Sequence, residues 1–265
     1  MGEIPPPERP LAYLREEEKP MSEQKKVCLD PGHDAGNLAN KSPDGTYYEH
    51  EFCLDTGRRI RDILERHGVA VTMTRDGDSA VSLAERCAVA NDIPGLNLFV
   101  SLHSNAAGGS GWSAASGWSA YIYGPGGDRE RAAQDILAAV RAAGIAVRGE
   151  PIVYDPKLYV LRHTKAPAVL LEQGFHTNQG DVANLKNAAY RQKLAEAEAK
   201  GILRYLGLVW QSPDEVEQAV AWAVESNLVN GIGQPGDIPI LAPRDASSRA
   251  QVATVIMRFV KYLDA

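Results

Sequence analysis

Residues 96–105, LNLFVSLHSN, contain a short run of apolar residues that ends at His103. A run of this length and composition is typical of a strand buried in the interior of a sheet. Residues 26–33, KVCLDPGH, contain a similar run, which stops at Pro31-Gly32 and is followed by His33. Two buried strands, each leading directly to a histidine, are the starting point for predicting the fold and the functional site.

Helical and strand-like patterns alternate along the chain around these two runs. Such alternation predicts an α/β fold with a mainly parallel, twisted sheet and helices on both of its faces. In sheets of this kind, functional residues gather just beyond the carboxyl ends of the strands. We expect strands at 26–30, 69–74, 96–103, 119–123, 159–162 and 168–172, and helices at 51–66, 83–91, 128–143 and 188–206.

Length and composition are those of an ordinary globular protein. The chain has 265 residues, 44% of them hydrophobic and 23% charged, and its net charge is -6. This length accommodates one large domain and a small appendage. The negative charge gives no reason to expect nucleic-acid binding. No stretch approaches the ~20 apolar residues needed to cross a bilayer, so no membrane span is expected.

The three cysteines, Cys28, Cys53 and Cys87, lie in apolar surroundings and show no CxxC spacing. An odd number without that spacing argues against a disulfide framework and against a cysteine-rich zinc site. We expect all three to be small buried hydrophobic residues.

Composition divides the chain into three parts. Residues 1–25 are rich in Pro and Glu, which predicts a disordered leader, and they lack the apolar core of a secretory signal. The absence of such a signal suggests either a protein made in the cytoplasm and released at lysis or a chain from which a signal has already been trimmed. Residues 26–208 form the main α/β domain. The composition changes at 211–213, and residues 212–265 are expected to form a small, mainly helical module.

The polar residues at the expected strand ends suggest a metal-dependent hydrolase. A hydrolytic zinc site needs three His or carboxylate ligands and an open position for water. His33, Glu49 and His103 could converge at one edge of the sheet, with Glu172 placed to serve as a base. Taken singly, each has a simpler explanation: a histidine at a strand end is commonly a polar rim residue, and a glutamate at a helix start is favoured by the helix dipole.

Five motifs, taken together, point to a known family. CLDPGH, YYEHEFCL, TRDGDSAVSLAERCAVAN, LFVSLHSNA and PAVLLEQGFHTN occur in this order between about residues 26 and 207. This series resembles the zinc-dependent N-acetylmuramoyl-L-alanine amidases of bacterial autolysins and phage endolysins. The resemblance implies that His33, Glu49 and His103 bind Zn²⁺ and that Glu172 is the catalytic carboxylate. It also implies that the substrate is peptidoglycan, cut between muramic acid and L-alanine.

Several positions remain open around this assignment. The family usually continues DPGH with two glycines, whereas this chain has Asp34-Ala35-Gly36, which puts the shape of the loop in doubt. Glu51 is a rival to Glu49, because both flank His50. We expect His50 and His67 at the surface, and His163 and His176 either beside the site or in structural roles. Residues 108–118, rich in Gly, Ser and Trp, are expected to form a mobile loop.

The C-terminal segment carries a second resemblance. AVAWAVESNLVNGIG followed by SSRAQVATVIMRF, within residues 212–262, is similar to an S-layer homology repeat, a wall-anchoring module. The resemblance implies that Arg249 contacts a pyruvylated secondary cell-wall polysaccharide. A single repeat would need partners from other chains, which suggests a homo-oligomer. The alternative is a helix pair that only packs on the catalytic domain.

Two other functions compete with the amidase. One is a non-catalytic wall-binding protein built on an inactive amidase fold; the complete set of His33, Glu49, His103 and Glu172 argues against it. The other is a zinc peptidase that cuts within the stem peptide, which the absence of an H-E-x-x-H motif weakens.

Overall fold

A computed structural model describes residues 24–212 of the chain. All but the last two residues of the leader expected at 1–25 lie outside this range, as does the C-terminal module apart from Ser212. The predicted glycan contact Arg249 also lies outside the described residues. Within residues 24–212, no helix is long and apolar enough to cross a membrane.

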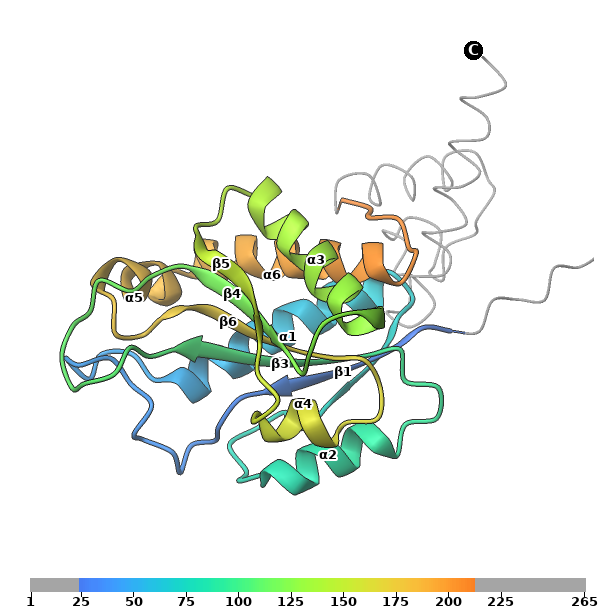
Figure 1. The fold of residues 1–265 in the computed structure, drawn as a ribbon, viewed down its shortest axis with the longest axis horizontal. Coiled ribbons are helices and arrows are strands. Elements are labelled where there is room, and N and C mark those ends of the chain that lie inside the picture. The colour runs from blue at the N-terminus through green and yellow to red at the C-terminus, as the bar shows by residue number, and fades with distance from the viewer. Residues whose placement is uncertain (1–23, 213–265) are drawn as a thin grey trace, which may run out of the picture.

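The centre of the fold is a six-stranded sheet with the strand order β2-β1-β3-β6-β4-β5 (Figure 1). Neighbouring strands are parallel except for β4 and β6, which are antiparallel. The predicted α/β class with a mainly parallel sheet is therefore confirmed. The strands are β1 (Lys26–Pro31), β2 (Ala70–Met73), β3 (Leu98–Asn105), β4 (Trp118–Ile122), β5 (Val147–Tyr154) and β6 (Ala168–Phe175).

Helices cover both faces of the sheet, as predicted. Three long helices pack on one face, and two shorter ones pack on the other (Figure 1). The first group is α1 (Glu49–Arg66), α3 (Gly127–Ala142) and α6 (Ala188–Tyr205); the second is α2 (Leu83–Asn91) and α4 (Tyr159–His163). The remaining helix, α5 (Gln179–Lys186), packs against α6 and β6.

Local sequence explains how these helices begin and pack. Helix α1 buries Phe52, Ile60 and Ile63, whose spacing puts them on the face turned to the sheet. Helix α2 begins at a capping box in which Ser82 and Glu85 bond each other's backbone N–H groups. Gly201 lets α6 approach α3 closely, because a Cβ atom there would lie 2.3 Å from the Cα of Ile136.

Three elements differ from the sequence-based predictions. Residues 159–162, predicted as a strand, belong to the short helix α4, which buries Val160 and Leu161. Periodicity alone cannot distinguish a strand from a helix in so short an apolar run. Strand β5 and helix α5 were not predicted. Gly149 and Pro151 interrupt the strand pattern of β5, and they are tolerated because β5 is at the edge of the sheet.

Candidate active site

The carboxyl edge of the parallel strands brings the predicted residues together. His33 lies two residues beyond β1, and His103 lies within β3, the strand next to β1. Glu172 lies inside β6, three residues before its end, and its Cα pairs in register with that of His103. The parallel register of β1, β3 and β6 thus places these side chains at one end of the sheet.

Glu49 completes the cluster from the first residue of α1. Its Oε1 atom is 3.0 Å from His103 Nδ1, and its Oε2 atom is 3.3 Å from His33 Nε2. One ligand atom from each of these three residues lies within 4.8 Å of the others. Glu51, the rival assignment, is exposed and does not belong to the cluster.

The cluster keeps the Glu49 carboxylate ionised. Burial alone would raise the pKa of Glu49, which is only 2% exposed. Hydrogen bonds from His103 and His33 outweigh burial and lower the pKa of Glu49 to about 2. The Ser104 backbone N–H also donates to Glu49 Oε1, at 2.9 Å. The site therefore presents a carboxylate anion between two imidazoles.

Glu172 lies beside this anion, but its own pKa is shifted in the opposite direction. Its Oε2 atom is buried and has no hydrogen-bond partner among the described residues. Burial, and then the nearby charge of Glu49, raise the pKa of Glu172 well above its usual value. The pKa values of these two neighbouring carboxyl groups are thus shifted in opposite directions. This is typical of a site where one group stays charged and the other exchanges a proton.

Two buried arginines hold the backbone that carries His33. Arg86 Nη2 donates to the His33 carbonyl at 2.7 Å, and Arg86 Nη1 donates to the Pro31 carbonyl at 2.6 Å. Arg75 donates to the carbonyls of Pro31 and Gly32 at 3.0 and 2.9 Å. His33 has a φ of 56°, which only a few per cent of non-glycine residues adopt. These bonds stabilise that conformation.

The same arginines connect the His33 loop to the rest of the site. Arg75 also donates to the carbonyl of His50, next to Glu49 at the start of α1, at 2.8 Å. Arg86 forms a buried ion pair with Asp30 at 2.7 Å, and the Ser101 and Thr74 hydroxyls donate to the same carboxylate at 2.6 Å. Each nitrogen of the two guanidinium groups and both oxygens of Asp30 form at least one hydrogen bond, so the network can hold these backbone positions with little freedom.

Gly32 allows His103 to pack directly against the loop. A Cβ atom at this position would lie 2.4 Å from His103 Cε1 and 2.7 Å from the Leu102 carbonyl oxygen. Any side chain there would displace the His103 ring. Asn37 and Asn40 lie against the other ring: Asn37 Nδ2 is 3.0 Å from His33 Nδ1, and Asn40 Nδ2 is 2.9 Å from both His33 Nδ1 and His33 Nε2.

The remaining histidines divide into one beside the site and three away from it. His176 is buried, with Nδ1 2.9 Å from the Ser104 carbonyl oxygen and 3.8 Å from Glu49 Oε2. His163 is exposed and stacks on Tyr159. The prediction that His50 and His67 are surface residues was wrong, because each is only 6% exposed. His67 is covered by Trp210, which stacks on its ring.

The loop at 108–118 is attached in its middle and near its C-terminal end. Ser113 donates its N–H to the Thr177 carbonyl at 2.7 Å, and Gly117 donates to Asp181 Oδ2 at 2.9 Å. Trp118, expected in the loop, is instead the first residue of β4 and is fully buried. All three cysteines are buried and unpaired, as predicted.

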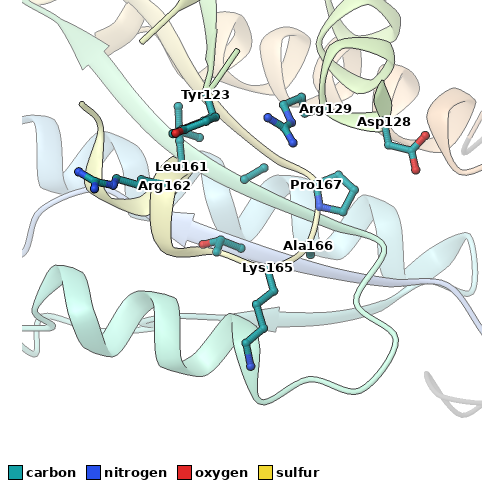
Figure 2. Close-up of a pocket in the computed structure, with 10 residues that line it drawn as sticks. Tyr123, Asp128, Arg129, Leu161, Arg162, Lys165, Ala166 and Pro167 are labelled. Carbon is teal, nitrogen blue, oxygen red and sulfur yellow. The ribbon is translucent and has the colours of Figure 1, made fainter. Parts of the chain in front are cut away.

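A hollow of about 540 Å³ lies away from this cluster (Figure 2). It lies at the opposite edge of the sheet, where β4 ends and β6 begins, and includes Tyr123 and Ala168. The charged ends of Arg162 and Lys165 point in different directions there (Figure 2). The cluster of His33, Glu49 and His103 lies, with Glu172, at the other end of the strands.

The fold and the cluster define an α/β enzyme with a candidate metal site at the carboxyl edge of its sheet. Residues 27–204 match the family model described as N-acetylmuramoyl-L-alanine amidase. The chain therefore belongs to this family of peptidoglycan-hydrolysing enzymes.

Named relatives agree with this assignment. The chain is 33% identical over 187 residues to the N-acetylmuramoyl-L-alanine amidase CwlM of Bacillus licheniformis, covering 69% of each chain. It is 35% identical over 193 residues to the "Probable cell wall amidase LytH" of Staphylococcus aureus, covering 71% of this chain and 60% of LytH.

Solved structures share the fold. The catalytic domain of the amidase CwlV from Bacillus (Paenibacillus) polymyxa var. colistinus matches with a TM-score of 0.63 and 30% identity, covering 70% of this chain and all of that one. An N-acetylmuramoyl-L-alanine amidase from Clostridium difficile 630 matches with a TM-score of 0.64 and 28% identity, covering 70% of this chain and 98% of that one.

Proposed function

We propose that this chain is a zinc-dependent amidase in which His33, Glu49 and His103 bind the metal and Glu172 moves the proton. The donor set supports zinc, because two imidazole nitrogens and one carboxylate oxygen form a known catalytic combination for this ion. The observation that carries the proposal is the convergence of these three donors in one cluster, in register with Glu172.

The metal would supply a Lewis acid that activates water and the lactyl carbonyl. Glu172 accepts a proton from the attacking water and later delivers it to the amine of L-alanine. Burial and the nearby charge of Glu49 raise the pKa of Glu172, which favours retention of the proton between its uptake and its release. Arg75 and Arg86 hold the His33 backbone in place, while Asn37 and Asn40 orient the His33 ring.

Product analysis tests the reaction. Mass spectrometry of digested peptidoglycan should show glycan with free muramic acid carboxylates and stem peptides that begin with free L-alanine. New ends within the stem peptide would instead identify a peptidase, and the absence of products would identify a non-catalytic wall-binding protein.

Elemental analysis tests the metal site. The purified protein should contain about one zinc per chain, and both His33→Ala and His103→Ala should lower that content strongly. Glu51→Ala is the matched control, since Glu51 adjoins Glu49 in sequence but is exposed, and it should retain the metal. Full metal retention in both histidine variants would contradict the assignment.

For residues 212–265 we propose wall targeting through an S-layer-homology-like module. Its support is the motif Ser248-Arg249-Ala250-Gln251, in which the arginine would form charged hydrogen bonds with a pyruvylated secondary polysaccharide. Assembly through several copies of the module would give a homo-oligomer.

Removing the module separates targeting from chemistry. A chain ending at residue 211 should cleave soluble muropeptides at nearly the full rate and bind whole walls more weakly, and Arg249→Ala should reproduce part of that loss. A truncated chain that melts much earlier, together with unchanged wall binding by Arg249→Ala, would show that the module is a scaffold.

A further inference from the structure

A row of three polar side chains crosses the sheet beside Glu172, and the amidase reaction as described makes no use of it. Asn105 Nδ2 lies 3.4 Å from the Tyr121 hydroxyl oxygen, and Arg148 Nη1 lies 3.3 Å from the same oxygen. The three residues come from β3, β4 and β5, and all are half-buried. Strands remote in sequence thus contribute an amide, a phenol and a guanidinium to one place.

Strand register places this row next to the reacting groups. Asn105 lies two residues beyond His103 in β3 and pairs with Phe175 of β6. Ser119 of β4 pairs with Glu172, and Tyr121 lies two residues further along β4, so its side chain is on the same face of the sheet as that of Ser119.

The position of Arg148 connects it to Glu172. Arg148 follows Val147, which pairs with Trp118 at the end of β4 nearest Glu172. Burial and the charge of Glu49 raise the pKa of Glu172, and the charge of Arg148 acts in the opposite direction. Arg148 is therefore close enough to Glu172 for its charge to be felt there.

The row has hydrogen-bond donors to spare. Within residues 24–212, the Arg148 side chain forms no ion pair and one hydrogen bond, to Tyr121. Its guanidinium lies over the Phe175 ring, 5.5 Å from the centroid, which fixes its position but uses none of its N–H groups. The Tyr121 oxygen receives both of the neighbouring contacts described above, so its own proton is free for an acceptor.

We propose that Arg148 and Tyr121, supported by Asn105, form a subsite for a carboxylate of the stem peptide. This inference rests on the proposed amidase function. A guanidinium fork with an adjacent hydroxyl donor matches the geometry of a carboxylate. The first free carboxylate after the scissile bond is that of the second stem residue, D-glutamate. Its amidated form, D-isoglutamine, has the same shape without the charge.

The test compares two soluble muropeptides that differ only in this group. The wild-type enzyme should cleave the D-glutamate substrate with the higher kcat/KM. Arg148→Ala should lower that value about 10- to 100-fold, as expected for a lost hydrogen bond to a charged group, and should change kcat/KM for the D-isoglutamine substrate by less than about threefold. Arg148→Lys and Tyr121→Phe should give smaller losses with the same substrate preference, and they serve if Arg148→Ala fails to fold.

Arg162→Ala is the matched control, because Arg162 is an exposed arginine at the opposite edge of the sheet. It should leave kcat/KM unchanged for both substrates. Equal losses on the two substrates in the Arg148 and Tyr121 variants would overturn the subsite, since an arginine that acted only through Glu172 would affect both alike; the amidase assignment would then stand. Failure of the wild-type enzyme to cleave either substrate would overturn both proposals.

Discussion

Strand β6 carries two adjacent residues, Glu172 and Gln173, whose side chains lie on opposite faces of the sheet. Each face holds one buried carboxyl group, that of Glu172 itself or that of Glu198, and the two groups differ in their hydrogen-bond partners. On one side, Glu172 Oε2 is buried without a partner among the described residues, and so is the hydroxyl of Ser119, the residue paired with Glu172 in β4. On the other side, Gln173 donates to Glu198 Oε2 at 2.6 Å, and the Trp118 indole donates to Glu198 Oε1 at 2.9 Å. The Gln173 Oε1 atom is itself buried without a partner among residues 24–212, but both oxygens of the Glu198 carboxyl group are bonded.

Both carboxyl groups have raised pKa values, and burial is the main cause in each. A raised pKa by itself therefore does not identify a catalytic acid or base. The difference lies in the partners: Glu198 is fully bonded within the core, whereas Glu172 adjoins the His–Glu cluster with an oxygen to spare. An unpartnered oxygen beside other reactive groups is the more specific sign of function.

The largest expected effect comes from Glu172→Gln. An amide cannot accept the proton of water, so turnover of soluble muropeptides should fall on the order of 10²- to 10⁴-fold. Zinc content and melting temperature should stay close to wild type, because the substitution keeps the shape of the side chain. Near-normal turnover would show that another carboxylate is the base.

Glu198 should affect the pH dependence of stability rather than chemistry. Burial raises the pKa of Glu198 to about 8, against a usual value of 4.5, and the hydrogen bonds from Trp118 and Gln173 only partly oppose this. The folded state thus favours the protonated form. Its stabilising contribution is complete below about pH 4.5 and is lost as the pH rises towards 8.

The free energy of unfolding should therefore decrease between pH 5 and pH 8.5, by on the order of 3 kcal/mol from this group. Glu198→Gln, which resembles the protonated acid, should remove most of that decrease and retain activity. Urea denaturation at several pH values measures the free energy of unfolding of the wild type and of the Glu198→Gln variant. The same slope in the variant would mean that Glu198 is ionised in the core.

Arg86→Lys should weaken the metal site without removing any ligand. Arg86 reaches Asp30 and Pro31 through Nη1 and His33 through Nη2, whereas lysine has a single nitrogen on a flexible stem, so His33 would be held less firmly. We expect about a 10- to 100-fold loss of zinc affinity in chelator competition, as for other residues that orient a ligand. Arg58→Lys is the control, because the Arg58–Asp76 pair is exposed. Equal affinities in the two variants would argue against the role of Arg86.

The smallest effect is expected from Ser119→Ala. The Ser119 hydroxyl is buried and has no partner within the part of the chain that the structure describes, so its removal should leave the free energy of unfolding unchanged or raise it by up to about 1 kcal/mol. Turnover should remain within about twofold of wild type. A marked loss of activity would show that this hydroxyl binds substrate or water during the reaction.

The sequence allowed the strands that lead to the site to be predicted well. Apolar runs that stop at polar residues indicated β1 and β3, and hence the edge where His33 and His103 meet. The choice of Glu49 over Glu51 came from motif alignment and agrees with the geometry, because only Glu49 lies in the cluster.

The supporting residues could not be predicted in this way. Arg86 contacts His33 across 53 residues of sequence, and no local pattern indicates such a bond. The sequence did contain an indication of their role. Arg75 and Arg86 both belong to the family motif TRDGDSAVSLAERCAVAN, and Arg86 lies next to Cys87 on the buried side of α2. Glu198 resembles an exposed helix position in sequence, and it is buried because α6 packs over Trp118.

The place of β5 at the outer edge of the sheet has an evolutionary consequence. An edge strand pairs on one side only, so its residues can be replaced with little effect on the strand that leads to His33 and on the strands that carry His103 and Glu172. Arg148 lies on this strand. Descendants of one ancestral enzyme could therefore diversify in the wall chemistry they recognise by changing β5, while selection keeps the hydrolytic machinery constant.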